Sequence, residues 1–343
     1  MRKSLTFLCI GVALSGCGGS LTANSASHSY LGTQGPGDVW AWDLTGATYT
    51  ATNQTLNHHY SGTKAVLPTG FLKLTVQNTD DPNVTVGQSA YALELPGTAL
   101  ILKMAGDDTK APIIASSLGS DPTGPQVTFN FVAVGSQNFQ PATDQAFSNV
   151  TLGVAGNIYS GVTHRWAVDG SPLANGAADF SASNGLMTDL IGINGVFGTG
   201  AMTPSGVCVL DYGPNNGGAI GVLQPAANVN LADLATRHFR GFMINQGKTQ
   251  CVTVTPNGDG TLHGAGYQLP SGVETGTLDN GGGPTVSFTG QPNPGEVTIN
   301  IAYGGGASDN LVAAINRVSG KYMLFCFAVG QGGTPYNVVL VEN

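Results

Sequence analysis

Alternation of apolar and polar residues dominates the pattern along this chain. In the segment FLKLTV, residues 71–76, leucine and valine alternate with lysine and threonine, so their apolar side chains would share one face of a strand. The same period of two recurs at 127–133, 239–245, 296–303 and 321–329. Clusters of Gly, Pro, Asn and Asp punctuate these segments at 78–83, 119–125, 256–260 and 279–284. The pattern predicts an all-β fold of short antiparallel strands, in which barrels and sandwiches are both open.

Helical patterning is sparse. Residues 231–238 have a helical pattern, and Asn230 is placed as its N-cap. A second candidate helix lies at 311–317.

Similar short segments occur in the two halves of the chain, in the same order. They are LELPG (93–97) and YQLPSG (267–272), GPQVTF (124–129) and GPTVSF (283–288), and WAVDG (166–170) and FAVGQG (327–332). Their spacing is far longer than the roughly 20 to 50 residues of a propeller or solenoid repeat, and it suits one β domain. We expect an internal duplication into two tandem antiparallel β domains at 36–175 and 200–343, joined by a linker at 176–199. Chance similarity in a chain with 51 glycines is the alternative.

The composition and charge of the chain limit the classes of partner that it is expected to bind. Charged residues make up 9% of the chain, which also contains 51 glycines and 18 prolines among apolar segments. Disordered chains are poor in apolar residues and rich in charge, so a folded β protein is expected. With 12 basic and 20 acidic residues, the net charge is -8. This balance argues against nucleic acid and against anionic lipid headgroups as partners.

The N-terminal segment has the features of an export signal. Arg2 and Lys3 precede an apolar run at 5–14, which is too short to span a bilayer as a helix. The following Leu14-Ser15-Gly16-Cys17 resembles the lipobox of bacterial lipoproteins.

That resemblance implies a signal peptide at 1–16, cleavage before Cys17, and modification of the Cys17 thiol with palmitate-type acyl chains. Gly18 in place of Asp implies, by the family's sorting rule, the outer membrane. Residues 17–35 are rich in small polar residues and are expected to form a flexible tether. An ordinary secretory signal with an incidental Cys17 is the alternative.

Three cysteines remain in the second half of the chain. Cys208, Cys251 and Cys326 allow at most one intrachain disulfide. All three lie in apolar segments with strand character, which favours buried structural thiols, with a disulfide as the alternative.

Sequence motifs of common enzymes and cofactor sites are missing. Gly247-Lys248-Thr249 follows Gly241 after five residues, where a Walker loop requires four, and neither G-x-G-x-x-G before a helix nor G-x-S-x-G occurs. His58 and His59 are adjacent and would point to opposite faces of a strand. NGDGT at 257–261 departs from a calcium loop at its sixth and twelfth positions and is predicted to be a turn. We expect no cofactor, no metal and no catalytic residue.

Trp40 and Trp42 are the candidate ligand-binding residues. They stand two positions apart in a predicted strand and would share a face, either as a stacking platform for a ligand or as part of a core. The leading hypothesis is a lipid-anchored envelope protein that binds, or interacts structurally with, a macromolecule, a glycan or another envelope component.

Two alternatives stay open. One is a hydrolase acting on polysaccharide or peptidoglycan, which would need two acids facing one cleft, drawn for example from Glu94, Asp169, Glu274 and Asp309. The other is a carrier of a small apolar ligand inside a barrel.

Overall fold

A computed structural model describes the fold of the chain. The residues that it describes are 28–34, 38–105, 112–117, 125–134, 144–183, 185–191, 197–203, 206–212, 217–245, 248–269, 272–274, 276, 282–330 and 333–343. Residues 1–16, the expected signal peptide, and Cys17 lie outside them. Within these ranges, no helix has the length and apolarity needed to cross a membrane.

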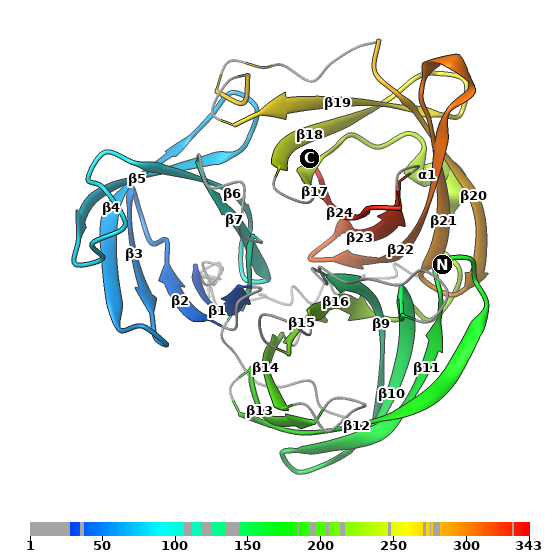
Figure 1. The fold of residues 1–343 in the computed structure, drawn as a ribbon, viewed down its shortest axis with the longest axis horizontal. Coiled ribbons are helices and arrows are strands. Elements are labelled where there is room, and N and C mark those ends of the chain that lie inside the picture. Colours follow the sequence, from blue (N-terminus) through cyan, green and yellow to red (C-terminus); the bar gives the residue numbers. More distant parts are fainter. Residues whose placement is uncertain are drawn as a thin grey trace, which may run out of the picture.

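The strands form three closed, eight-stranded antiparallel barrels that follow one another along the chain. Figure 1 shows them end-on, side by side in a triangle. Barrel 1 consists of β1 (Ser29–Gln34), β2 (Asp38–Asp43), β3 (Thr48–Asn53), β4 (His58–Val66), β5 (Leu72–Thr79), β6 (Ser89–Leu95), β7 (Ala99–Met104) and β8 (Ile113–Ser117). Strand β1 pairs with both β2 and β8, which closes the barrel.

Barrel 2 repeats the arrangement. It consists of β9 (Gln126–Val134), β10 (Phe147–Ala155), β11 (Ile158–Trp166), β12 (Pro172–Ser183), β13 (Leu186–Ile191), β14 (Phe197–Met202), β15 (Val207–Asp211) and β16 (Gly218–Leu223). Strand β9 pairs with β10 and β16. Each strand is therefore next to its neighbours in sequence, as in an up-and-down barrel.

Barrel 3 follows a short helix, α1 (Leu231–Leu234). It consists of β17 (Phe239–Asn245), β18 (Lys248–Pro256), β19 (Leu262–Gln268), β20 (Thr285–Asn293), β21 (Glu296–Ala302), β22 (Ser308–Val318), β23 (Lys321–Val329) and β24 (Pro335–Glu342), with the 3-10 turn η1 (Gly304–Gly306) before β22. Strand β17 pairs with β18 and β24.

The all-β class and the tandem antiparallel arrangement are confirmed, and the domains are barrels. Their number and boundaries differ from the expectation, because the chain forms three barrels and not two domains. The expected linker 176–199 contains the end of β12, all of β13 and the start of β14. This segment resembles a linker because small and polar residues fill the exposed faces of β12, whose first eight residues are all exposed or half-buried.

The matched segments also fall on non-equivalent strands. Residues 126–129 of GPQVTF lie on β9, the first strand of barrel 2 in sequence, whereas residues 285–288 of GPTVSF lie on β20, the fourth strand of barrel 3. The similarity reflects the strand and turn chemistry that all three barrels share.

Two local expectations need correction. Residues 29–34, expected in the flexible tether, form β1, whose Tyr30 is fully buried. Residues 311–317, a candidate helix, lie within β22 because their alternate side chains pack into the interior of barrel 3. The helix expected at 231–238 is confirmed over its first turn, and Asn230 caps it.

Each barrel has its own hydrophobic interior, and a fourth cluster joins the three. Strand β6 contributes side chains both to the interior of barrel 1 and to the shared cluster. Ala90 and Ala92 belong to the interior of barrel 1, whereas Tyr91 and Leu93 point outward into the shared cluster. Because both faces of this strand are buried, its sequence reads as a nearly continuous apolar run.

The shared cluster draws residues from all three barrels. Phe71 of barrel 1 meets Phe242 of barrel 3 edge to face, with ring centroids 5.5 Å apart, and Val209 of barrel 2 belongs to the same cluster. Side chains also bond across the barrels: Asn337 Nδ2 donates to the carbonyl of Ala133 at 2.6 Å. The three barrels therefore pack as one body around a common core.

Candidate binding site at the mouth of barrel 3

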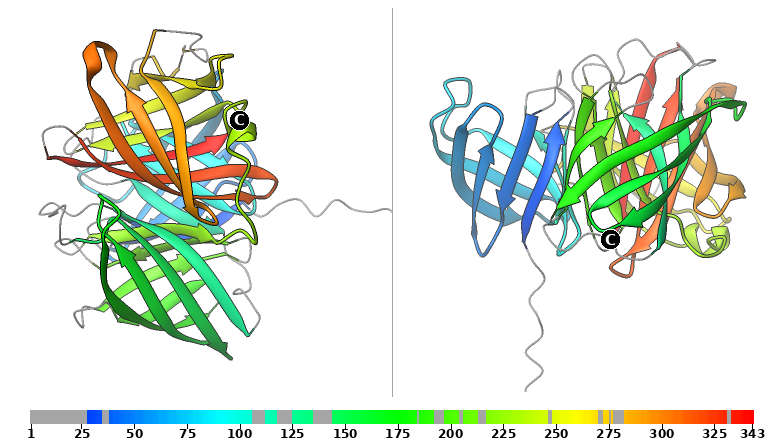
Figure 2. Two further views of the ribbon diagram at one scale, coloured as in Figure 1. Left: turned by 90° about the vertical axis from the view of Figure 1, so that its right-hand side faces the viewer. Right: turned by 90° about the horizontal axis from the view of Figure 1, so that it is seen from below.

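One end of the three-barrel body is defined by the beginning of β1, and we call it the tether end. His28 precedes β1, and its Nδ1 lies 2.5 Å from Glu94 Oε1 near the end of β6. Thr98, in the β6–β7 turn, has its Oγ1 2.5 Å from Oγ of Ser319 in the β22–β23 turn. The end of barrel 3 that contains the β22–β23 turn therefore lies at the tether end of the body. Figure 2 shows the start of β1, helix α1 and the C-terminus along one edge of the body.

Helix α1 lies across this end of barrel 3. Asn230 Oδ1 accepts hydrogen bonds from the backbone N–H groups of Ala232 and Asp233, at 3.0 and 3.3 Å, which satisfies donors that a helix start leaves unpaired. Leu234 is fully buried in the interior cluster of barrel 3. The cap starts the helix, and Leu234 anchors it in the barrel.

Asp233 fixes the position of α1 on the barrel. Its Oδ1 accepts hydrogen bonds from Arg237, the shortest at 2.5 Å, and its Oδ2 accepts from Arg317 at 2.8 Å and from the Tyr322 hydroxyl at 3.0 Å. These donors, the Arg237 hydrogen bond first, hold the pKa of Asp233 below its usual value. Because Arg317 and Tyr322 lie on β22 and β23, one carboxylate ties the helix to the barrel wall.

A second acid completes this network. Arg237 Nη1 donates to Glu342 Oε1 at 3.2 Å, and Glu342 Oε2 accepts from the backbone N–H of Tyr322 at 2.9 Å. The Arg317 guanidinium stacks over the Tyr322 ring, 4.4 Å from its centroid. Two arginines are thus balanced by two acids beside the mouth of barrel 3.

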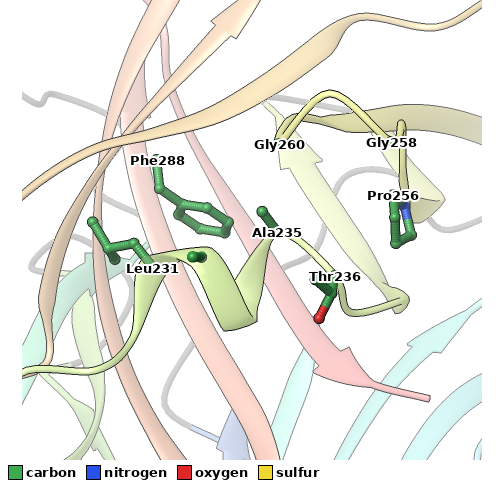
Figure 3. Close-up of a pocket in the computed structure, with 8 residues that line it drawn as sticks. Leu231, Ala235, Thr236, Pro256, Gly258, Gly260 and Phe288 are labelled. Atoms are coloured by element: carbon green, nitrogen blue, oxygen red, sulfur yellow. The ribbon is translucent and has the colours of Figure 1, made fainter.

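A pocket of about 380 Å³ opens between α1 and the barrel. It is lined by Leu231, Ala232, Ala235, Thr236, Pro256, Gly258, Gly260 and Phe288 (Figure 3). None of these eight residues carries a charge, and Thr236 directs its hydroxyl to the carbonyl of Asp233 at 2.7 Å. The volume lies in the range of small-molecule sites, roughly 300 to 1,000 Å³.

The position of Phe288 follows from strand pairing. Strand β20 pairs with β19 only as far as Leu262↔Val286 among the described residues. Phe288 lies two residues further on, shares the face of Val286, and packs against the interior cluster of barrel 3. Its ring therefore projects at the mouth, where no β19 residue covers it.

The β18–β19 turn forms the opposite rim. Gly258 and Gly260 have positive φ angles of 80° and 85°, a conformation that glycine adopts without strain. Asp259 Oδ1 accepts from the backbone N–H of Thr261 at 2.9 Å, so its carboxylate supports the turn. The turn prediction for 257–261 is confirmed, and the rim offers backbone and glycine to a ligand, with Asp259 as its exposed charged group.

Trp40 and Trp42 lie on one face of β2, inside barrel 1. Their rings stack with centroids 5.7 Å apart, and the row continues through Tyr60 on one side and Tyr49 on the other. Trp42 is 5% exposed, while Trp40 is half-buried. Their faces are largely occupied by each other and by the two tyrosines, so the rings belong to the barrel packing.

The four acids considered for hydrolysis have separate surroundings. Glu94 accepts from the Tyr30 hydroxyl inside barrel 1 at 2.8 Å, and Asp309 accepts from the Tyr336 hydroxyl in barrel 3 at 2.9 Å. Glu274 binds Lys73 and Tyr91 of barrel 1, with both distances 2.5 Å, and Asp169 accepts from Ser171 in a turn of barrel 2. The structure does not bring these four together.

The histidine pair and the cysteines take structural positions. His59 Nδ1 lies 2.8 Å from Asp80 at the end of barrel 1 opposite the tether end. The three cysteines are buried and free, and burial raises the thiol pKa of each, to about 12 for Cys326. Among the described residues, no three His, Cys, Asp or Glu side chains are grouped so that they could hold a metal ion.

Sequence reasoning did not single out the pocket residues. It placed a helix after Asn230 and a turn at 256–260, but nothing in the linear pattern shows that these segments meet. Phe288 belongs to GPTVSF, which was interpreted as part of a repeat. The contact depends on barrel closure, which joins residues far apart in sequence.

Comparisons with known proteins leave the chain without a family. No protein-family model and no curated protein matches it. A solved putative DNA polymerase III beta subunit from Eubacterium rectale aligns over 92% of this chain and 91% of its own, at 7% identity and a TM-score of 0.13. The DNA polymerase III subunit beta from Pseudomonas aeruginosa aligns over 94% and 93%, at 8% identity and a TM-score of 0.11. These likenesses carry no argument about function.

Proposed function

We propose that this chain is a lipid-anchored protein of the bacterial cell envelope, on the outer membrane, that works by binding. The mouth of barrel 3 is its binding site, and a small uncharged apolar group is its ligand. The pocket carries this proposal, because it combines a suitable volume with an uncharged lining of Leu231, Ala235 and Phe288 around one open mouth.

The chemistry of the mouth favours an apolar ligand. An anion entering it would lose water without gaining an opposite charge, since Arg237 and Arg317 are already paired with Asp233 and Glu342. An apolar ring or chain would instead cover the half-buried ring of Phe288 and remove both apolar surfaces from water. This is the chemistry of the carrier alternative, placed at a barrel mouth rather than deep inside a barrel.

The lipid anchor rests on the resemblance of Leu14-Ser15-Gly16-Cys17 to a lipobox. Two or more acyl chains hold a protein stably at a membrane, so a modified Cys17 would keep the barrels at the envelope. Replacing Cys17 with Ser should abolish acylation and release the protein from the membrane fraction. A wild-type protein without lipid would contradict the anchor while leaving the pocket proposal intact.

Binding is tested with the fluorescent apolar probe N-phenyl-1-naphthylamine. The wild-type protein should bind the probe and enhance its emission, and Phe288→Ala should weaken the affinity. Losing about 1.5 kcal/mol of contact between the probe and the Phe288 ring would raise the Kd about tenfold.

Leu56→Ala is the matched control. Leu56 is 56% exposed in the β3–β4 loop, at the end of barrel 1 opposite the tether end. This variant also removes an apolar side chain but should leave the affinity unchanged. Equal weakening by both variants, or no binding by the wild type, would contradict the proposed site.

A further inference from the structure

We infer that the occupant of the barrel 3 mouth is an acyl chain of a lipid in the membrane that anchors the protein, so that the tether end docks on the bilayer. This inference rests on the proposed function, because it requires both the anchor at Cys17 and the apolar pocket. It adds the source of the ligand and the orientation of the body.

The mouth of barrel 3 lies at the tether end of the body. Asp233 of α1 contacts Tyr322, which follows the β22–β23 turn, and Ser319 in that turn contacts Thr98 of barrel 1. Thr98 follows Glu94, the partner of His28. This series of contacts places the pocket at the end of the body from which the chain leads back to Cys17.

Few residues separate Cys17 from the body of the protein. Cys17 and His28 are eleven residues apart in the sequence. At no more than about 3.6 Å per residue, His28 can lie no further than about 40 Å from an anchored Cys17. The tether end therefore stays within about 40 Å of the membrane that holds the acyl chains, which places lipid hydrocarbon within its reach.

Docking of the mouth on lipid buries apolar protein surface that water otherwise covers. A lipid chain gains little by exchanging bilayer hydrocarbon for protein hydrocarbon, but the lining of the mouth gains by leaving water. Leu231 and Phe288 are half-buried and can be covered further. The free energy that favours docking therefore comes from burial of apolar protein surface rather than from the lipid chain.

The charges around the mouth set the lipid preference. Asp233 and Glu342 balance Arg237 and Arg317 in one network. Asp259 on the rim and Lys321 at the start of β23 carry opposite charges, so this end of barrel 3 offers no net positive charge to an anionic headgroup. Docking should therefore proceed on zwitterionic lipid and should resist added salt.

The experiment uses the full-length lipidated protein in phosphatidylcholine vesicles. Phe288→Trp places a fluorescent reporter in the pocket. Because the wild type already contains three tryptophans, the emission of the reporter is the emission of the variant minus that of the wild type. The vesicles are made either with brominated acyl chains, which quench indole on contact, or with unbrominated chains. Brominated chains should cause a loss of the added emission, and raising the salt concentration should leave that loss unchanged.

Two further variants keep the result interpretable. Leu231→Trp places a reporter on α1 in the same pocket and replaces Phe288→Trp if the latter does not fold. Leu56→Trp places one at the opposite end and should not be quenched. Equal quenching at both ends, or quenching at neither, overturns the inference.

Probe binding tests the proposed function independently of the lipid inference. If the lipidated wild type binds N-phenyl-1-naphthylamine in detergent solution while the pocket reporters are not quenched in vesicles, the pocket stands and the lipid source fails. If the probe does not bind and the reporters are not quenched, the proposed function fails as well.

Discussion

Phe242→Ala should destabilise all three barrels, although Phe242 belongs to barrel 3. Its side chain is fully buried in the shared cluster and packs edge to face on Phe71 of barrel 1. Truncating a buried Phe to Ala costs about 3 to 5 kcal/mol through lost burial and the cavity left behind. If the shared core makes the barrels one cooperative unit, the whole body loses that free energy.

The tryptophans make this coupling measurable. The three tryptophans are Trp40, Trp42 and Trp166, so barrel 3 has none. Urea unfolding followed by tryptophan fluorescence therefore reports barrels 1 and 2 only. A loss of about 4 kcal/mol, with an m-value of about 3 kcal/mol/M, should lower the fluorescence midpoint by about 1.3 M.

Val86→Ala is the control for this measurement, because Val86 is 61% exposed and its truncation should change stability by less than about 0.5 kcal/mol. Far-UV circular dichroism should follow the same transition as fluorescence. The reasoning is refuted if Phe242→Ala leaves the fluorescence midpoint unchanged while circular dichroism shows a separate, earlier phase.

Three further predictions concern buried and charged groups. Asp233→Asn should weaken probe binding at neutral pH, because α1 loses the ionised acceptor shared by two arginines and a tyrosine. Since the folded-state pKa of Asp233 is lowered, its contribution to holding α1 is fully present above its unfolded pKa of about 3.9 and is lost as pH falls through the lower folded pKa. A wild-type affinity for the probe that drops between pH 8 and pH 5 would contradict this. Burial raises the pKa of Glu296, so ionisation weakens the fold as pH rises through and above its unfolded value of about 4.3. Glu296→Gln should therefore raise the urea midpoint at pH 7, with the advantage shrinking toward pH 4, and an unchanged midpoint at pH 7 would count against it. Cys208, Cys251 and Cys326 should be inert to a thiol reagent in the folded protein and react fully in denaturant, because burial raises each thiol pKa; rapid labelling of the native protein would show that these thiols are accessible.

The strands could be predicted where one face is buried. The alternation at 71–76 predicted the start of β5, where Leu72, Leu74 and Val76 are buried while Lys73 and Thr75 are half-buried. Alternation fails where both faces are buried, as in β6, and where both are exposed, as at the start of β12. That explains why residues 176–199 looked like a linker and why the third barrel was missed.

The candidate site was less accessible to sequence reasoning. Asn230 signalled a helix start and the glycines at 258 and 260 signalled a turn, and both features are present. Their meeting with Phe288 depends on which strands close barrel 3, which local patterns do not encode. The pairing of Asp233 with Arg317 likewise joins residues that are distant in sequence.

The most direct test of binding at the mouth of barrel 3 is a crystal of the protein soaked with 1-bromonaphthalene and measured at the bromine absorption edge. The account predicts an anomalous peak between Leu231, Ala235 and Phe288. A peak inside barrel 1 beside Trp40, or no peak in a crystal whose mouth is open to solvent, would contradict it.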